Sequence, residues 1–554
     1  MRFAFGSAAL GFSTAAFAAD FNVGNQTDWN TAVAAINGAA SGSTNTINFT
    51  SGFTLTSSLN PIAVSNTNVT TIINGNNHVV DGASNFQGIV VNGANAPIVS
   101  ASNLSLTNTA ARGGDGQNGQ NGYFSGGLSY GSGGGGGGGG AAGGGLYVGS
   151  GAQVTLTGVT FAGNAAVGGA GGAGGSAQNT APDPVNGGNG GDGGGFNGIG
   201  VGGAGGVGGH AGTQGTVGTA ASSSGAGGGG GGGSGTTNST SYTPNNDGGA
   251  GSSPGGNGGR DGDGVTNFGG NSGPGADGGF GGSGGGAQGG AIYVATGGTL
   301  TINDTPISGT SVTGGAGGAA GVGQGPSNFD GAPGAVGSAT GSAMFINGTT
   351  ANVGVSAGTV TYSGTIAGTG LTTGGVNTAL VKTGTGTLVL SGVNTYTGNT
   401  VVSGGIVSIA ANSNLGNAAN ALVLQDGSGV AFTGSFTTSR AITVAGDPIF
   451  DVASGQTVTI STAIANGGAP GDVAKTNTGT LVLSAVNTYT GPTTITAGTL
   501  TLTGAGKIAT SSSVIDNGTF DISGVTGTGT SIVSLSGSAS GSVVLGSKTL
   551  TITS

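Results

Sequence analysis

One stretch of seventeen residues occurs twice in this chain. KTGTGTLVLSGVNTYTG begins at Lys382, KTNTGTLVLSAVNTYTG begins at Lys475, 93 residues later, and fifteen of the 17 positions are identical. Because side chains alternate along a strand, Leu388 and Leu390 point one way, and Thr387, Val389 and Ser391 point the other way. Asn and Gly in NTYTG favour a turn. Such a unit has too little apolar surface to be buried alone, so the repetition predicts a solenoid of stacked units.

The composition agrees with an all-β solenoid. Only 5% of the 554 residues are charged, no residue is Glu, and 137 are Gly, whereas an ordinary soluble domain carries about 25% charged residues. Thr and Val favour strands, and Gly and Asn favour turns. We therefore expect an all-β parallel β-helix, with Leu, Ile and Val inside and Thr or Ser outside. The absence of Cys means that no disulfide forms, and a net charge of −10 without a basic patch argues against nucleic acid as a partner.

The chain divides into four parts with different composition. MRFAFGSAALGFSTAAFA carries one Arg, a run of apolar and small residues and an A-x-A pattern, which is typical of a signal peptide. In DWNTAVAAIN, Asp28 is a candidate N-cap, and apolar residues recur at helical spacing, so a short helix is expected there. The expected parts are a signal peptide (1–18), an N-terminal β-helix part (19–112), a Gly-rich region (113–345) and a second β-helix part (346–554).

Two rungs of the β-helix interrupt the Gly-rich region. Residues 144–167 and 290–313 align at a constant offset of 146, which matches Tyr147 with Tyr293. The remaining tract contains repeated triplets such as GGAGGAGG. Chains rich in Gly and Ser behave as flexible coils, but glycine at every third position also suits packed helices of the polyproline-II type. Under either alternative the tract leaves the β-helix as long, low-complexity Gly-rich insertions.

Residues 382–409 and 475–502 resemble the autotransporter-associated β-strand repeat, whose hallmark is GTLxLSGxNTYTG preceded by Lys. Asn477 replaces the usual first Gly in the second copy. The resemblance implies a right-handed parallel β-helix that is displayed on, or secreted from, the outer membrane of a Gram-negative bacterium. It also implies an outer-membrane translocator barrel as partner, which takes about a dozen amphipathic strands with aromatic girdles. The final residues, SVVLGSKTLTITS, do not have that pattern. We therefore expect the barrel to be missing from this chain through truncation, a split gene or another secretion route.

Candidate catalytic groups are few. His78 has Asp81 nearby in NGNNHVVDG, and His210 lies in VGGHAGT, but neither is accompanied by a recognisable nucleophile, as a Ser-His-Asp triad requires. The sequences GLSYG (127–131) and GVSAG (354–358) match G-x-S-x-G by letter. The motif depends on a strand–turn–helix setting, which neither offers. A turn histidine is the favoured interpretation.

Metal and carbohydrate-cleaving chemistry have equally little support. Arg112 and Asp115 are close in RGGD, whereas β-helix polysaccharide-degrading enzymes need clustered carboxylates with a basic residue. GGNGGDGGG (187–195) and GPGADGGF (273–280) approach the calcium-binding nonapeptide but lack its apolar position and its tandem copies. RDGD (260–263) is not the attachment motif that it resembles.

These observations predict an adhesin-like structural protein and no enzyme. It would mediate attachment of the cell surface, with glycans or other cell surfaces as partners, or self-association through open strand edges. No catalytic, cofactor-binding or metal-binding residue is expected, and no cofactor. The alternatives are a β-helix polysaccharide-degrading enzyme and a calcium-binding secreted repeat protein.

Overall fold

The structure is a computed structural model that describes residues 18–125, 128–129, 132–178, 189, 192, 194–195, 264–265, 275–276, 279–323 and 330–553. All but the last residue of the expected signal peptide, as well as His210 and RDGD (260–263), lie outside these residues.

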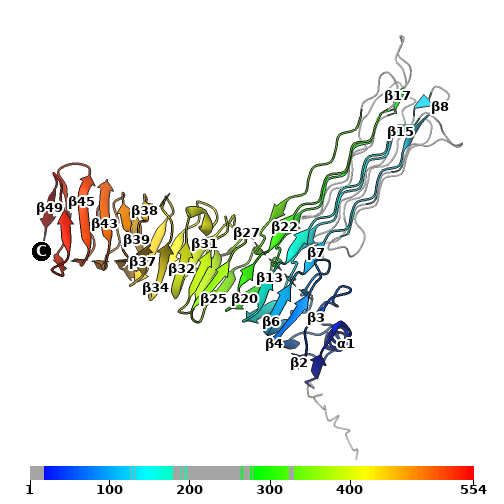
Figure 1. Cartoon of the computed structure of the whole chain (residues 1–554), viewed down its shortest axis with the longest axis horizontal. Coiled ribbons are helices and arrows are strands. Elements are labelled where there is room, and N and C mark those ends of the chain that lie inside the picture. Colours follow the sequence, from blue (N-terminus) through cyan, green and yellow to red (C-terminus); the bar gives the residue numbers. More distant parts are fainter. Residues whose placement is uncertain are drawn as a thin grey trace, which may run out of the picture.

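A long solenoid of parallel strands forms the body of the protein (Figure 1). Each strand pairs with the strand one rung before it and one rung after it. Leu388 lies beside Val407, Val407 beside Val430, and Val430 beside Phe450, which are 19, 23 and 20 residues apart. The predicted all-β parallel solenoid is therefore confirmed.

Four ladders of strands, almost all paired in parallel, run along the solenoid. The first ladder contains β1 (Asp20–Val23), β2 (Thr44–Phe49), β4 (Thr70–Asp81), β6 (Ile98–Thr107), β12 (Gln153–Thr157), β20 (Thr299–Asn303), β25 (Ala351–Gly354), β29 (Val376–Thr383), β31 (Asn399–Val402), β33 (Leu422–Leu424), β36 (Ile442–Gly446) and β39 (Ile464–Gly471). The second contains β3 (Phe53–Thr54), the ends of β4 and β6, β13 (Thr160–Ala162), β21 (Ile307–Ser308), β26 (Thr359–Tyr362), β30 (Thr387–Leu390), β32 (Gly405–Ile409), β34 (Ser428–Phe432), β37 (Ile449–Val452), β40 (Val473–Thr476), β42 (Thr493–Ile495), β44 (Val514–Asp516) and β47 (Leu535–Gly537).

On the third face of the solenoid the strands form two separate ladders, one towards each end of the chain. The N-terminal ladder contains β5 (Ile89–Val91), β11 (Leu146–Val148), β19 (Ile292–Val294), β24 (Met344–Asn347) and β27 (Ile366–Thr369). The C-terminal ladder contains β35 (Phe436–Thr438), β38 (Thr457–Ile460), β41 (Thr480–Leu483), β43 (Thr499–Gly504), β45 (Thr519–Val525) and β48 (Ser542–Val544), with the pair β46 (Gly529–Ile532) and β49 (Thr549–Ile552) beyond it. The hairpin strand β28 (Leu371–Thr373) pairs antiparallel with β29.

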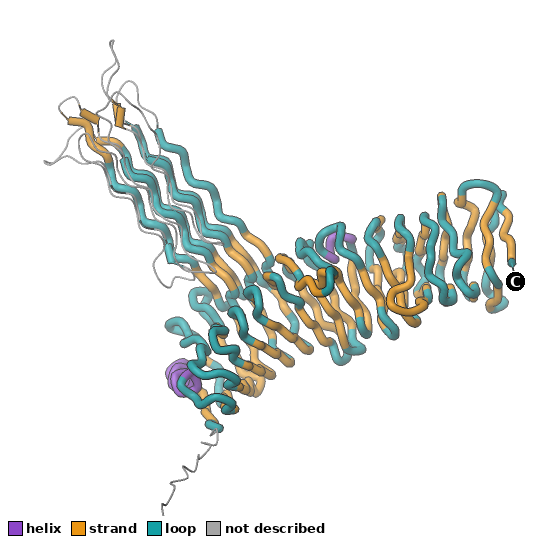
Figure 2. The backbone as a smooth tube through the Cα atoms, turned by 180° about the vertical axis from the view of Figure 1, so that it is seen from behind, coloured by secondary structure: helices purple, strands orange, loops and turns teal. Residues whose placement is uncertain are grey.

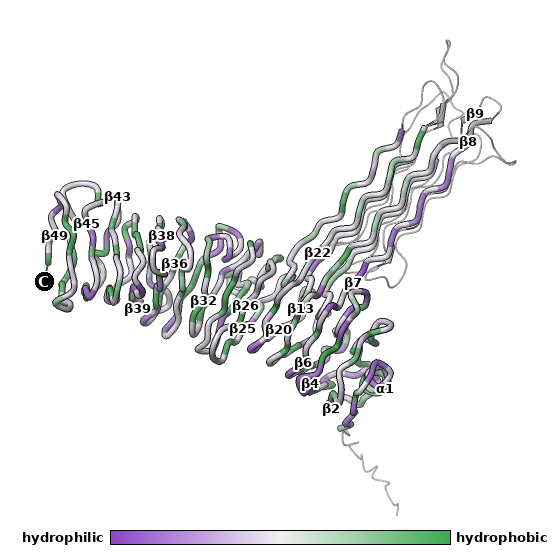
Figure 3. Tube along the Cα trace, viewed as in Figure 1, coloured by the Kyte–Doolittle hydropathy of each residue, from purple (hydrophilic) through white to green (hydrophobic). Residues whose placement is uncertain are grey.

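The interior of the solenoid is one continuous apolar core from Val23 to Ile532. In β30, Leu388 and Leu390 are buried, and Thr387 and Val389 are partly exposed, as the alternation in GTLVLS predicted. Figure 3 shows the resulting alternation of apolar and polar residues along the rungs. Stacking therefore buries apolar surface that no single rung could bury alone. This burial stabilises the fold by roughly 25 cal/mol for each Å² removed from water.

One helix, α1 (Gln26–Asn37), lies at the N-terminal end of the solenoid (Figure 1). Trp29, Val33 and Ile36 are buried, as their spacing predicted. The predicted cap is wrong: Asn25 is the N-cap, and its side chain accepts a hydrogen bond from the Asp28 N–H at 3.0 Å. Asp28 lies in the first turn instead, where its carboxylate accepts the Gly24 N–H and complements the helix dipole.

The two copies of the long repeat lie on different faces of the solenoid. Lys382 belongs to β29 in the first ladder, whereas Lys475 belongs to β40 in the second ladder, four rungs beyond Leu388. The TLVL strand of the second copy, β41, stacks in the third-face ladder, with Val458 and Leu500 as neighbours of Leu481. An offset of 93 residues therefore corresponds to four rungs and one further face.

Glycine-rich segments project from the solenoid as a packed array (Figures 1 and 2). Three consecutive rungs each send out one segment and receive it back. The outgoing segments follow β7 (Ala110–Arg112), β14 (Ala165–Val167) and β22 (Ser311–Thr313), and the returning ones precede β10 (Ala141–Ala142), β18 (Ala287–Gln288) and β23 (Ala339–Thr340). Further short strands among these segments are β8 (Gly122–Ser125), β9 (Leu128–Ser129), β15 (Ala177–Gln178), β16 (Gly264–Val265) and β17 (Gly275–Ala276).

Glycines at two of every three positions donate backbone hydrogen bonds to neighbouring segments, as Gly168, Gly169, Gly171 and Gly172 do. Gly169 donates to Gly139, Gly285 to Gly169, and Gly315 to Gly285, each at 2.8 Å. A Cβ on Gly285 would stand 1.9 Å from the Gly139 carbonyl oxygen. Only glycine permits this approach, as in packed helices of the polyproline-II type. The described segments of the tract are therefore packed closely on one another, which is what the second of the two arrangements considered from the sequence requires.

Candidate functional site

The histidine considered as a catalytic base has no triad around it. His78 lies half-buried in β4, beside Leu104. Asp81 is three positions further along the same strand, which places the two side chains on opposite faces. The Asp81 carboxylate accepts the Ala83 N–H at 2.7 Å and the Asn108 side chain at 3.0 Å. It therefore fixes a turn and does not orient His78.

The two G-x-S-x-G matches lack the setting of a nucleophile elbow. Ser356 lies between β25 and β26, with no helix after it, and its Oγ donates to Asp304 Oδ2 at 2.7 Å. In GLSYG, the described residues Leu128 and Ser129 form β9, which pairs antiparallel with β8. Neither serine opens a helix.

Arg112 and Asp115 are not paired with each other. Arg112 Nη2 donates to the Ser84 carbonyl at 2.8 Å, and Asp115 Oδ1 accepts the Ala170 N–H at 2.7 Å. Both side chains therefore bind backbone of neighbouring rungs or segments. About half of the residues of the two calcium-like stretches lie outside the described residues. Within the described residues, no three acidic or histidine side chains are grouped as a metal site would need.

Three aspartates of successive rungs form a column that the sequence did not reveal. Asp426 Oδ1 accepts the Asp447 N–H at 3.2 Å, and Asp447 Oδ1 accepts the Gly427 N–H at 3.3 Å. Burial, together with the charges of Asp447 and Asp426, raises the pKa of Asp472. Asp426 and Asp447 are exposed on turns, which makes this column a poor candidate for a water-excluding catalytic site.

The lysine of each repeat is buried in a cage of backbone carbonyls. Lys382 Nζ donates to Thr383 O, Gly384 O and Gly404 O at 2.8, 2.9 and 3.0 Å, and its side chain is 0% exposed. Lys475 makes the same three contacts, with Thr476 O, Asn477 O and Ala497 O. Three carbonyls match the three N–H donors of an ammonium group. Burial lowers the pKa of each lysine to about 8.

The NTYTG turn is equally structural. Tyr396 is fully buried and its hydroxyl bonds Thr400 Oγ1 at 2.6 Å, and the Tyr489 hydroxyl bonds Thr493 Oγ1 at the same distance. Asn394 and its counterpart in the second copy each accept a backbone N–H from the preceding rung. The buried Asn and Tyr of the repeat therefore serve bonding within and between rungs, whereas Val393 and Thr395, on either side of Asn394, are exposed.

A groove on the third face is the best candidate for ligand binding. Its centre is a column of three aromatic rings from consecutive rungs, Tyr147 in β11, Tyr293 in β19 and Phe345 in β24. Tyr147 and Tyr293 stack with ring centroids 5.2 Å apart and planes inclined by 10°, and Tyr293 and Phe345 stack at 5.7 Å and 6°. Parallel pairing in register places these rings above one another.

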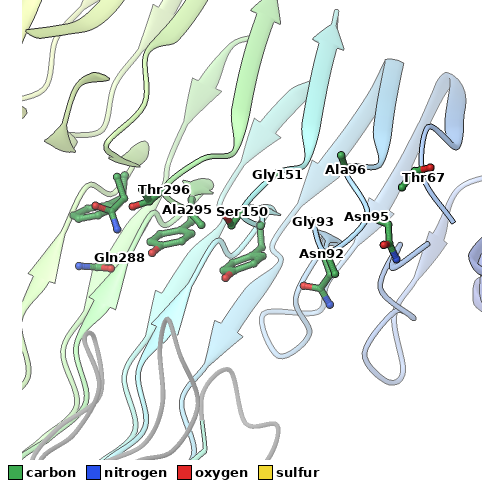
Figure 4. A pocket seen from close by; sticks show the side chains of 16 residues that line it. Thr67, Asn92, Gly93, Asn95, Ala96, Ser150, Gly151, Gln288, Ala295 and Thr296 are labelled. Carbon is green, nitrogen blue, oxygen red and sulfur yellow. The ribbon is translucent and has the colours of Figure 1, made fainter. Parts of the chain in front are cut away.

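The turns after β5, β11 and β19 supply most of the polar side chains that line the rest of the groove, and Thr67, Gln288 of β18 and Asn347 of β24 add to them. The groove encloses about 1170 Å³ (Figure 4). The polar lining residues are Thr67, Asn92, Asn95, Ser150, Gln288, Thr296 and Asn347. None of the residues that line the groove is charged at neutral pH. Amides and hydroxyls both donate and accept hydrogen bonds, so the groove suits a neutral, polar ligand.

The aromatic column is rigid and polar at its edge. Tyr293 is 3% exposed, whereas Tyr147 and Phe345 are half-buried. Burial and the neighbouring Tyr293 raise the pKa of Tyr147 to about 12, and burial also raises the pKa of Tyr293, whose hydroxyl bonds the Asn347 side chain. Both hydroxyls therefore stay protonated at physiological pH. Alignment of the two rungs in the sequence matched Tyr147 with Tyr293 but did not include Phe345. Phe345 also lies between two apolar residues, and this shared pattern could have identified it.

Comparison with known proteins gives two matches. The family model described as passenger-associated-transport-repeat matches residues 380–409 and 473–506. Over 127 residues, 23% of this chain, the sequence is 39% identical to the adhesin BmaC autotransporter of Brucella suis biovar 1 (strain 1330), and the match covers 4% of that protein. No solved structure matches. None of the helices in the described part of the chain is long and apolar enough to span a membrane.

The matches confirm the resemblance that the two repeats carried in the sequence. The chain has the repeats of an adhesin-like autotransporter passenger, which is a protein secreted from, or displayed on, the outer membrane of Gram-negative bacteria. The matched ranges contain the boundaries 382–409 and 475–502 that the sequence indicated.

Proposed function

We propose that this adhesin-like autotransporter passenger acts as a stiff stalk that attaches the cell surface to glycans or to other cells. The observation that carries the proposal is the pair of passenger-associated-transport repeats, joined by the match to an autotransporter adhesin. A solenoid with one continuous core is stiff along its axis, because each rung packs on the next. The array holds its outer residues away from the stalk (Figure 1).

Attachment by this stalk would be physical and not catalytic. Its groove is lined by amides, hydroxyls and aromatic rings, which offer hydrogen bonds and contact area, and the lining contains no carboxylate. Outward Thr, Ser and Asn side chains along the rungs offer many weak hydrogen bonds, each worth about 1 kcal/mol. Such ladders suit a repetitive partner, either a glycan or a second copy of the chain.

The organisation that fits this role follows from the sequence. We propose residues 1–18 as the signal peptide, 113–345 as a region that inserts a projecting array between rungs, and residues 19–112 and 346–554 as the stalk. An autotransporter passenger implies a translocator domain in the full protein. That domain would be the direct partner of this chain during export.

Display of the chain on a non-adherent Gram-negative host tests the proposal. The chain would be fused to a heterologous translocator, and bound cells would be counted on epithelial monolayers and on glycan-coated surfaces. We expect adhesion well above that of cells that display the translocator alone. Equal adhesion of the two strains, with surface exposure of the passenger shown by antibody labelling, would contradict the proposal.

A further inference from the structure

We propose that the aromatic groove across β5, β11, β19 and β24 binds a linear, neutral oligosaccharide that lies along the solenoid axis. This inference rests on the proposed attachment function and names its ligand class and its site. The repeats do not line this groove: they occupy residues 380–409 and 473–506, and the groove lies between residues 67 and 347.

The first argument is the chemistry of the lining. Sugar rings have apolar C–H faces and hydroxyls at their edges. The groove offers aromatic carbon from Tyr147 and Phe345, with amide groups of Asn92, Asn95 and Gln288 around it. Aromatic rings combine a large contact area with few rotatable bonds, so little entropy is lost on binding.

The second argument is charge. Each of the sixteen residues that line the groove is uncharged at neutral pH, and burial keeps the Tyr147 hydroxyl protonated. A uronic acid chain or a nucleic acid would place its anionic groups there without a compensating cation, which costs free energy because its charges lose water. The lining also contains no carboxylate pair, so cleavage of a glycosidic bond is not expected.

The third argument is periodicity. Neighbouring strands of a sheet repeat every ~4.8 Å, and an extended chain of pyranose units repeats on a similar length scale. The lining side chains come from equivalent turns of successive rungs: Asn92 follows β5, Ser150 follows β11 and Thr296 follows β19 (Figure 4). One sugar unit could therefore meet one rung, and several units would bind together.

Isothermal titration of the full chain with defined oligosaccharides tests the inference. The probes are cellohexaose, maltohexaose and N-acetylchitohexaose as neutral chains, with hexagalacturonate as the charged comparison. We expect at least one neutral hexasaccharide to bind. The disaccharide of the same sugar should bind at least about tenfold more weakly, and hexagalacturonate should not bind. Absence of binding by all neutral chains, or equal binding of the charged one, would overturn the inference.

Blocking variants locate the site. Ser150→Trp fills the groove from an exposed turn, and Thr372→Trp places the same side chain on the exposed hairpin strand β28 as the matched control. We expect Ser150→Trp to weaken binding by about tenfold or more and Thr372→Trp to leave it unchanged. Circular dichroism checks that both variants fold. Thr296→Trp provides a second block if Ser150→Trp fails to fold. Oligosaccharide binding that survives a folded block refutes the site.

The outcome for this groove is separable from that for attachment. Displayed Ser150→Trp cells that adhere as well as the parent would leave attachment standing and reject the groove as its cause. Oligosaccharide binding by the groove without any cell adhesion would reject the attachment function alone. Capture of a peptide in place of a saccharide, blocked by the same variant, would overturn the ligand class proposed here.

Discussion

Substitution of Gly285 by alanine should open the glycine array while leaving the solenoid intact. Gly285 lies in the middle of the array, between the segments that contain Gly139, Gly169 and Gly315. The new Cβ would stand 1.9 Å from the Gly139 carbonyl oxygen. Since nonbonded heavy atoms pack at ~3.5 Å, the two segments would have to move apart by about 1.5 Å.

The cost follows from the bonds that this displacement breaks. Between the segments of Gly139 and Gly285, Gly138 donates its N–H to Ser283 O at 2.8 Å and Ala141 donates to Gly286 O at 2.9 Å. Each buried backbone group left without a partner costs about 1–3 kcal/mol, and overpacking adds about 1–3 kcal/mol. We therefore expect a loss of roughly 4 kcal/mol, confined to the array, because distant rungs share no contact with it.

Hydrogen exchange followed by mass spectrometry measures this loss locally. A change of roughly 4 kcal/mol corresponds to about a thousandfold faster exchange of array amides in Gly285→Ala, while amides in β30 and β41 should exchange as before. Gly468→Ala is the matched control, since a Cβ there meets nothing within 4 Å. Unchanged protection of the array in a folded Gly285→Ala protein would refute the close packing described here.

Three further predictions concern the stalk. Burial lowers the pKa of Lys382 and Lys475 to about 8, below the value of about 10.4 in the unfolded chain. Between about pH 8 and about pH 10.4 the unfolded chain therefore binds more protons than the folded chain, and the free energy of unfolding rises with pH. Denaturant titrations at several pH values should show this rise in the parent and in the exposed-lysine control Lys507→Met, but not in the double variant Lys382→Met/Lys475→Met. The same dependence of the free energy of unfolding on pH in all three proteins would contradict the prediction. Tyr396→Phe should destabilise by about 1–2 kcal/mol and Tyr489→Phe by less, because Thr493 Oγ1 keeps Ser511 Oγ as a partner at 2.8 Å; the reverse order of unfolding midpoints would be unexpected. Arg440→Lys should expose amides 412–420 to faster exchange, because the buried guanidinium donates to four carbonyls of that loop and one lysine cannot reach them all; unchanged protection would show that the loop holds without it.

Local patterns in the sequence determined which residues face the core. In GTLVLS, alternation decides which side chains are buried, and it does so in both copies, because the period of a strand is two wherever the strand lies. The match of Tyr147 with Tyr293 likewise predicted equivalent rungs, and the structure places them in register. Glycine at every third position pointed to close-packed helices as one of two alternatives.

Contacts between rungs depended on loop lengths, which carry no local pattern. Since rungs differ in length, the second copy of the repeat lies one face away from the first, and Lys475 stacks in the ladder of Leu388. Asn25 caps α1 in place of Asp28 because its backbone is extended, with φ −157° and ψ 177°, whereas Asp28 lies within the first turn of the helix.

The groove shows most clearly which features depend on local sequence and which depend on tertiary structure. Each of its turns looks like any other turn of a solenoid when read along the chain, and Asn92, Ser150 and Thr296 are separated by 58 and 146 residues. The sequence by itself determined that this chain forms strands, that the strands stack, and that the stack has the repeats of an autotransporter passenger. Only the tertiary structure decided that three aromatic rings align and that uncharged side chains gather beside them, because a ligand site on a solenoid is made across rungs, whereas sequence patterns act within one.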